Sequence, residues 1–317
     1  AWAFTEKQQN LYLEYRNLSM PVVNEYIPGD ETSFTIIAFP VPAIGEQFPE
    51  IFKETIRINT LDYELYRDMQ QKIIDVLDTA EYVEITGKGE NQTNMQVQLA
   101  AISNPEKQTK FENCVADVNI PLGEVFTSPK LAGTNGILNV GTVYIGDIQY
   151  RNLRMEFKDG RVVSAVCDNF VENGVIDQEA GHRLIVQGIM NGHETLPLGE
   201  FAIGTNTTAY AMAEKFGILD RLPILIVEKM GPHFAVGDTC YSWSEDSPMY
   251  NPDGKEMIAR DNEVSILRKE DVSKAYFGVH TDITIPYKEL ERISAVREDG
   301  TKVDIILDGR FVLAGLD

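Results

Sequence analysis

Three Asp-Gly pairs constrain the fold of this chain most strongly, because each lies beside a short segment rich in branched apolar residues. Asp159-Gly160 separates residues 153–157 from residues 162–166, and Asp299-Gly300 and Asp308-Gly309 flank a third such segment. An Asp-Gly pair favours the positive φ angles that two-residue hairpin turns need. The sequence therefore predicts antiparallel hairpins here and a β-rich second part of the chain.

The chain before residue 110 has a different pattern. Residues 1–19, 48–58 and 61–77 are predicted helices. The last of them carries an apolar residue at every fourth position, which favours a helix packed on a sheet. These positions are Leu61, Leu65, Met69, Ile73 and Leu77. Three strands are also predicted, over residues 32–39, 82–85 and 95–99.

The change of pattern near residue 110 predicts an α/β fold in two domains. We expect an α/β domain over residues 1–110, followed by a β-rich α+β domain over residues 111–317. A chain of 317 residues can hold two domains, since domains cluster at about 100–150 residues. One helix is expected in the second domain, over Thr207–Lys215, and residues 241–275 are expected to form a long excursion that overhangs a site.

Composition excludes several classes of partner. The formal net charge is −21 and the isoelectric point about 4.6, so the surface repels nucleic acid and anionic membranes. No apolar run approaches the roughly 20 residues that span a bilayer. The three cysteines are too few and too scattered for a disulfide framework or a thiolate zinc site, which predicts a reducing, cytoplasmic location. They are Cys114, Cys167 and Cys240.

Chemistry is expected around residues 228–241. The continuous apolar run over residues 223–227 predicts a strand buried on both faces. Glu228 and His233 follow it, so the strand would deliver polar side chains to the rim of a core, where sites often form. The alternative for Glu228 is a charge at a strand end, paired with Lys229 or Arg221.

A second histidine lies in His280-Thr-Asp282, which has the composition of another strand. Residues two apart in a strand point to the same face, so His280 and Asp282 would project together. An imidazole beside a carboxylate can bind a metal ion. The alternative is a neutral histidine that forms a hydrogen bond with its neighbour. His182 and His193 have no ligand-like spacing and are expected at the surface or at a helix cap.

The string Pro-Leu-Gly-Glu occurs twice, ending at Glu124 and at Glu200, and an apolar run follows each copy. Either glutamate alone would be interpreted as a solvated charge at the mouth of a strand. Together with His233, His280 and Asp282, however, they make a set rich in oxygen that contains two imidazoles. Such a set suits a pair of divalent ions, because carboxylates can bridge two metals.

The segment Asn119-Ile-Pro-Leu-Gly-Glu124-Val-Phe-Thr-Ser-Pro129 resembles the N-x-P-x-x-E-V-F-T-x-P motif of the thermostable metallo-aminopeptidases, the leucyl aminopeptidase-like aminopeptidase T and aminopeptidase S family. The resemblance continues through Gly199-Glu200, through Glu228 with His233 five residues later, and through His280-Thr-Asp282 to Asp308-Gly-Arg-Phe311. Members begin with a further α/β segment, and this chain begins with Ala rather than Met. We therefore expect that an amino-terminal portion is missing.

The resemblance implies two divalent metal ions, zinc, cobalt, manganese or magnesium, with Glu200 as the bridge. It implies five ligands: Glu124, Glu200, His233, His280 and Asp282. The family also has a tyrosine seven residues after the first of these histidines, where this chain has Cys240, and Tyr241 follows. We expect a one-residue bulge to make Tyr241 the sixth ligand, because sulfur is a soft ligand for a hard site. The alternative is that the ligand itself differs.

The resemblance further implies a homodimeric metallo-aminopeptidase that removes the amino-terminal residue of peptides with a free amino terminus. Glu200 and Glu228 would be the catalytic carboxylates, with Glu228 as the proton carrier. The alternatives are a non-catalytic acidic binding or assembly protein, an inactive family member, and a dinuclear phosphoesterase. The last would need basic residues around the metals to hold phosphate, and few lie near these positions in the sequence.

Overall fold

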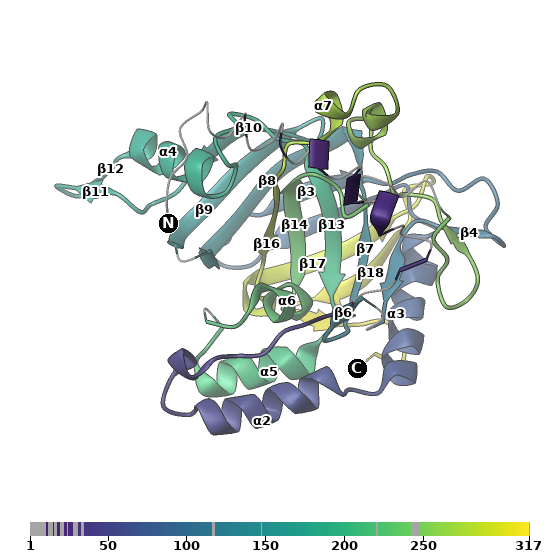
Figure 1. The fold of residues 1–317 in the computed structure, drawn as a ribbon, viewed down its shortest axis with the longest axis horizontal. Coiled ribbons are helices and arrows are strands. Elements are labelled where there is room, and N and C mark those ends of the chain that lie inside the picture. The colour runs from purple at the N-terminus through teal and green to yellow at the C-terminus, as the bar shows by residue number, and fades with distance from the viewer. Residues whose placement is uncertain are drawn as a thin grey trace.

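The computed structural model describes residues 35–115, 118–146, 148–219, 221–241 and 248–316, with isolated positions between 11 and 32. The predicted helix over residues 1–19 lies outside the continuous ranges. The fold is mixed α/β, as predicted, and its core lies between two antiparallel sheets (Figure 1). In the described part of the chain, no helix is both long and apolar enough to cross a membrane.

The larger sheet has eight strands in the order β10-β9-β8-β3-β2-β17-β18-β19. Strands from both sides of residue 110 pair within it, and the two-domain division stays a prediction. The strands are β2 (Tyr82–Gly87), β3 (Asn94–Gln98), β8 (Lys130–Ile145), β9 (Ile148–Lys158), β10 (Arg161–Val166), β17 (Leu290–Val296), β18 (Lys302–Leu307) and β19 (Arg310–Phe311).

The Asp-Gly pairs at 159–160, 299–300 and 308–309 each join neighbouring strands of this sheet, so the predicted hairpins are confirmed. In two of them both residues have positive φ: 43° and 66° at Asp159-Gly160, and 50° and 70° at Asp308-Gly309. These are the angles of a two-residue hairpin loop. At Asp299-Gly300 the glycine has a φ of 81° and its amide donates to the Arg297 carbonyl, which gives a longer turn.

The smaller sheet has five antiparallel strands in the order β16-β14-β13-β7-β5. Its central strands β13 and β14 are buried along their whole length. One face supplies apolar side chains, such as Phe201, Phe234 and Ile283, to the core shared with the larger sheet. The strands are β5 (Glu112–Cys114), β7 (Glu124–Thr127), β13 (Leu198–Gly204), β14 (Pro232–Gly237) and β16 (His280–Thr284).

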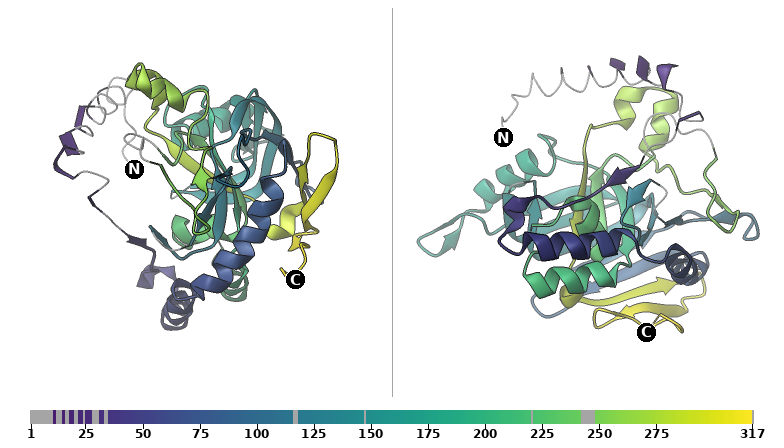
Figure 2. Two further views of the ribbon diagram at one scale, coloured as in Figure 1. Left: turned by 90° about the vertical axis from the view of Figure 1, so that its right-hand side faces the viewer. Right: turned by 60° about the horizontal axis from the view of Figure 1, so that its bottom comes forward.

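Helices α2 (Phe48–Asn59) and α5 (Thr207–Phe216) lie side by side and share a second apolar cluster (Figure 2). Both were predicted to within one residue, and α5 ends at Gly217, whose φ is 63°, because glycine adopts this left-handed conformation at little cost. Helix α4 (Gln178–Gly188) packs near β10. The other short elements are η1 (Pro42–Ile44), η3 (Ser265–Lys269), α7 (Val272–Ala275), η4 (Tyr287–Glu289) and the paired strands β1 (Ile36–Ile37) with β6 (Asn119–Ile120), β4 (Gln108–Thr109) with β15 (Glu256–Met257), and β11 (Val171–Glu172) with β12 (Val175–Ile176).

Helix α3 (Tyr63–Leu77) forms as predicted, but its buried face differs from the predicted stripe. Leu65 is 54% exposed, whereas Ile73 and Leu77 are buried. A spacing of four residues advances about 40° round a helix of 3.6 residues per turn, so the stripe winds round the helix and only its last two members face the core. The residues that are buried are Tyr66, Gln70, Ile73, Ile74 and Leu77.

The predicted strand over residues 223–227 is wrong. Pro223 instead precedes the short helix α6 (Ile224–Val227), and the 3-10 turn η2 (Glu228–Met230) continues it. Ile226 is buried but Ile224 is 49% exposed, as expected for a helical turn with one side facing solvent. Short apolar runs fit a helix or a strand equally well, and periodicity cannot distinguish them.

Candidate metal centre

Strand register brings the five predicted ligands to one face of the smaller sheet, opposite the apolar core. Successive side chains in a strand alternate between faces, and residues paired across neighbouring strands share a face. We call these residues the ligand cluster: Glu124, Glu200, His233, His280 and Asp282. Their cross-strand partners on this face are small: Gly204 beside Glu124, Ala235 beside Glu200 and Asp282, Ala202 beside His233, and Gly237 beside His280.

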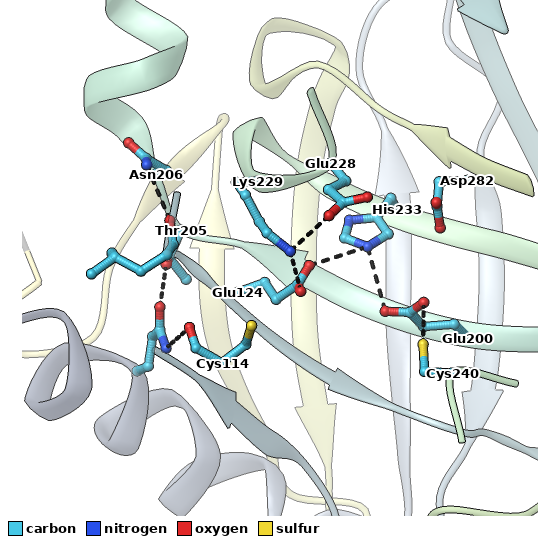
Figure 3. Close-up of polar contacts among 12 residues, drawn as sticks. Cys114, Glu124, Glu200, Thr205, Asn206, Glu228, Lys229, His233, Cys240 and Asp282 are labelled. Atoms are coloured by element: carbon cyan, nitrogen blue, oxygen red, sulfur yellow. Dashed lines mark hydrogen bonds and ion pairs between the residues drawn. The ribbon is translucent and has the colours of Figure 1, made fainter. Parts of the chain in front are cut away.

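Glu200 contacts both imidazoles of the ligand cluster, and Figure 3 shows it between His233 and the Cys240 thiol. Its Oε1 is 3.5 Å from Nε2 of His233, and its Oε2 is 3.1 Å from Nε2 of His280. Glu124 approaches from the other side, with its Oε2 at 3.5 Å from Nε2 of His233. Asp282 Oδ1 is 3.5 Å from Nε2 of His280. The two oxygens of Glu200 thus face two different imidazoles, and its role as a metal bridge stays a prediction.

Among the described residues, two groups of side chains could each hold one metal ion. Glu124, Glu200 and His233 make one, and all three are buried. Glu200 also belongs to the other, together with His280 and Cys240. Within each group the ligand atoms lie within 4.8 Å of one another. The structure therefore places the shared glutamate between two potential cation positions.

Two buried oxygens of the ligand cluster have no hydrogen-bond partner among the described residues: Glu124 Oε2 and Asp282 Oδ1. Each faces an imidazole nitrogen at 3.5 Å, beyond the usual hydrogen-bond length. Leaving a buried polar atom unpaired costs about 1–3 kcal/mol. A divalent cation would satisfy both oxygens, and carboxylate oxygens with imidazole nitrogens suit zinc, cobalt or manganese. The side chains present therefore fit such ions.

Lys229 and Glu228 reach the ligand cluster from η2, which follows α6 and passes close to β13. This approach depends on Gly204, because a Cβ there would lie 2.6 Å from the backbone of Lys229 and Gly231. Lys229 is fully buried, and its ammonium contacts Glu124 Oε1 and lies 2.8 Å from Glu228 Oε1. The pairing of Glu228 with Lys229 was one of the sequence alternatives, whereas the burial of Lys229 against Glu124 could not be predicted, since lysine is rarely fully buried.

Burial and neighbouring charges shift the pKa values of Glu228, His233 and Lys229. Burial raises the pKa of Glu228 to about 7, although the Lys229 charge opposes the shift. Burial lowers the pKa of His233, but Glu200 and Glu124 outweigh this effect and raise it to about 9. Burial also disfavours the charged form of Lys229, yet Glu124 and Glu228 hold its pKa well above the ordinary value.

Cys240 and Tyr241 occupy different surroundings. The Cys240 thiol donates to Glu200 Oε2 at 2.9 Å and lies 4.0 Å from Nε2 of His280. The Tyr241 hydroxyl instead donates to Glu112 on the edge strand β5, and its ring stacks on Phe126 with centroids 5.8 Å apart. The assignment of Tyr241 as a metal ligand stays a prediction, and the structure places the neighbouring thiol beside the cluster.

A cavity of about 1100 Å³ adjoins one side of the ligand cluster. His280 and Asp282 line it, together with apolar side chains such as Leu222 and Val227 from the α5–η2 region. Its size is near the upper end for ligand pockets, roughly 300–1,000 Å³. The other two histidines are engaged elsewhere, His182 with the Ala165 carbonyl and His193 with that of Phe277.

This fold and this cluster of carboxylates and imidazoles define an α/β protein with a candidate metal centre. A model of the thermophilic metalloprotease family (M29) matches residues 5–311, so the chain belongs to that family. No curated protein sequence matches the chain.

Two solved structures are similar to this fold. Wild-type AmpT from Thermus thermophilus has a TM-score of 0.55 at 18% identity, over 87% of this chain and 62% of that one. The 2,5-dihydroxypyridine dioxygenase from Pseudomonas putida KT2440 has a TM-score of 0.45 at 14% identity, over 84% of this chain and 63% of that one. The chain thus spans less than two thirds of either protein. The first likeness supports the fold, and the second is too weak to support an argument.

Proposed function

We propose that this protein is a metallo-aminopeptidase that uses two divalent ions to hydrolyse the amino-terminal bond of peptides. The main support is the position of Glu200, whose two carboxylate oxygens face His233 and His280 in a member of a metalloprotease family. The fold likeness to AmpT, an aminopeptidase T, agrees with this proposal.

Glu124, Glu200 and His233 would hold one ion, and Glu200, His280 and Asp282 would contribute to the other. Bound divalent ions supply a nucleophile from water at neutral pH and polarise a carbonyl group. The surrounding chain would contribute a rigid frame, because the opposite face of the same strands is packed in the core. Rigid support of this kind keeps ligands in position before substrate arrives.

Glu228 is the proposed proton carrier. It is buried beside Lys229, and Figure 3 shows its carboxylate on the side of His233 and the ligand cluster. A buried carboxyl group at this distance from the cluster is suited to accept a proton and return it. It would take a proton from the attacking water and deliver it to the leaving amine.

The substrate would occupy the cavity beside His280 and Asp282. The acidic side chains at its edge would stabilise the ammonium group of a free amino terminus, which would confine cleavage to the first residue. Apolar lining such as Leu222 and Val227 would accept uncharged side chains. A homodimeric state and a cytoplasmic location stay predictions from the sequence.

Metal analysis and peptidase assays test this function. We expect about two equivalents of zinc, cobalt or manganese per chain, and release of aminoacyl-anilides that a chelator abolishes. Glu200→Gln should lower turnover by more than about 100-fold, the upper end of the loss seen even for outer-shell partners. Glu298→Gln makes the same chemical change at an exposed position and should leave turnover unchanged. A chain that binds no divalent ion at saturating supply, or that turns over normally as Glu200→Gln, would contradict the proposal.

A further inference from the structure

Cys240 completes one of the two potential cation positions. Its Sγ lies 2.9 Å from Glu200 Oε2 and 4.0 Å from His280 Nε2, and the two latter atoms are 3.1 Å apart. Zinc bonds of about 2.0–2.3 Å in a tetrahedral site place ligand atoms about 3.3–3.7 Å from one another. The three observed separations bracket that range, so small side-chain movements would let one cation contact all three atoms.

The position of Cys240 relative to His280 is fixed by Asp238. The Asp238 carboxylate accepts hydrogen bonds from the amides of Phe277 and Gly278 at 2.7 and 2.9 Å. These contacts tie the end of β14, which leads into Cys240, to the start of β16, which carries His280. The hydrogen bonds of Asp238 therefore hold the segment that carries Cys240 and the segment that carries His280 together.

Asp238 also determines the tautomer of His280. Nδ1 of His280 lies 2.7 Å from the backbone carbonyl oxygen of Asp238, which can only accept a hydrogen bond. Nδ1 must therefore carry the proton, and in the neutral ring Nε2 is left with a free electron pair directed towards Glu200 and Cys240. Metal-binding histidines in proteins are commonly oriented by such a bond from the other ring nitrogen.

We propose that Cys240 binds a metal ion as a thiolate, as a further protein ligand beside Glu200, His280 and Asp282. This rests on the proposed function in that the site must bind divalent ions. The S–H proton, which the thiol now donates to Glu200, would pass to solvent when the ion binds. The pair of positions would then be unequal: one has only oxygen and nitrogen ligands, and the other contains sulfur.

Unequal ligands predict unequal metal preference. Sulfur favours softer ions, so the Cys240 position should select zinc or cobalt over manganese or magnesium. The Glu124 position, with two carboxylates and one imidazole, should discriminate less. Cys240 is accessible to solvent whereas Cys114 and Cys167 are buried, so an ion can reach it without rearrangement of the core.

Cobalt loading tests the proposal by absorption spectroscopy. The full chain loaded with two equivalents of Co²⁺ should show a near-ultraviolet sulfur-to-cobalt charge-transfer band. Cys240→Ser should lose this band and bind zinc at one position with an affinity reduced more than the about 10–100-fold cost of losing an outer-shell partner. The control is Cys167→Ala, which removes a buried thiol that contacts Gly181 and should keep the band.

The outcomes separate this proposal from the peptidase function. A band that persists in Cys240→Ser, or a doubly loaded wild type without a band, overturns thiolate binding. Hydrolysis of aminoacyl-anilides without the band leaves the peptidase function standing and removes the Cys240 assignment. A band that Cys240→Ser abolishes, in a protein with no hydrolysis, supports the assignment and rejects the peptidase function. A chain that binds no cobalt contradicts both.

Discussion

Lys229 places a positive charge beside the carboxylates of the ligand cluster, and this charge comes from a protein side chain and not from a bound ion. Its ammonium occupies Glu124 Oε1, which leaves Oε2 directed at His233. The lysine therefore orients Glu124 as well as neutralising part of the local charge. Buried carboxylates that lose their cation are strongly destabilised, because neither water nor another partner replaces it.

Replacing this lysine should therefore destabilise the folded state. We expect Lys229→Met to lower the free energy of unfolding by about 3–5 kcal/mol, the usual cost of removing one partner of a buried ion pair. Lys302→Met is the control: Lys302 pairs with Glu84 at the surface, and such pairs contribute about 1 kcal/mol or less. Urea denaturation of the metal-free proteins measures both. Equal losses in the two variants would show that Lys229 has no special role.

Glu228 should make stability depend on pH in a defined direction. Its pKa is raised from 4.5 to about 7, so between these values the folded chain keeps a proton that the unfolded chain has released. Stability from this group is fully present below pH 4.5 and is lost as the pH rises through 7. Relative to Glu228→Gln, the metal-free wild type should lose up to about 3 kcal/mol over this interval, at 1.36 kcal/mol per pKa unit. Parallel curves from urea denaturation at several pH values would contradict this.

At the scale of elements, the sequence predicted best where one local rule decides the conformation. The Asp-Gly hairpins and the end of α5 at Gly217 depend on backbone angles that few residues adopt, so they could be located in advance. The segment 223–227 could not be assigned, because five apolar residues fit a helix or a strand and the choice depends on tertiary packing.

The same contrast holds within the candidate site. His280 and Asp282 could be placed on one face because they lie two apart in a strand, and Asp282 and its neighbours do pair as β16. The approach of η2 to β13 could not be predicted, since it depends on contacts between segments far apart in the sequence. The sequence therefore indicates Lys229 only as a possible partner of Glu228 at a strand end, whereas it is buried between Glu124 and Glu228.

Substitution of Gly204 tests how much the candidate metal centre depends on the close packing of η2 against β13. Gly204→Ala would force η2 away from β13, because the new Cβ would meet backbone at 2.6 Å. We expect a loss of about 1–3 kcal/mol in stability, typical of overpacking, together with weaker metal binding as Lys229 and Glu228 move. Gly141→Ala is the control, since the nearest atoms to its Cβ would be those of the flexible Glu289 carboxylate, at 3.2 Å and beyond. Denaturation and metal titration of both variants decide whether the effect is specific to Gly204.

At the scale of the whole molecule, the ligand cluster joins four of the five strands in the smaller sheet, β7, β13, β14 and β16. The opposite face of these strands forms part of the core shared with the eight-stranded sheet. Separation of the ligands therefore requires disruption of the core. An ion bound to them should oppose unfolding of the whole molecule rather than of one loop.

Metal removal should therefore lower the thermal stability of the whole chain. An ion that binds the folded state alone, at 100 times its Kd, stabilises by about 2.7 kcal/mol. For domains of 150–250 residues each kcal/mol shifts Tm by about 2–4 °C, so we expect a fall of several degrees on chelation, reversed by zinc in a concentration-dependent way. Calorimetry of the metal-free and zinc-loaded protein measures this. Glu200→Gln should lose most of the zinc-dependent rise because it removes a shared ligand, whereas Glu298→Gln should keep it. An identical Tm with and without zinc in the wild type would mean that the cluster does not hold metal in the folded protein.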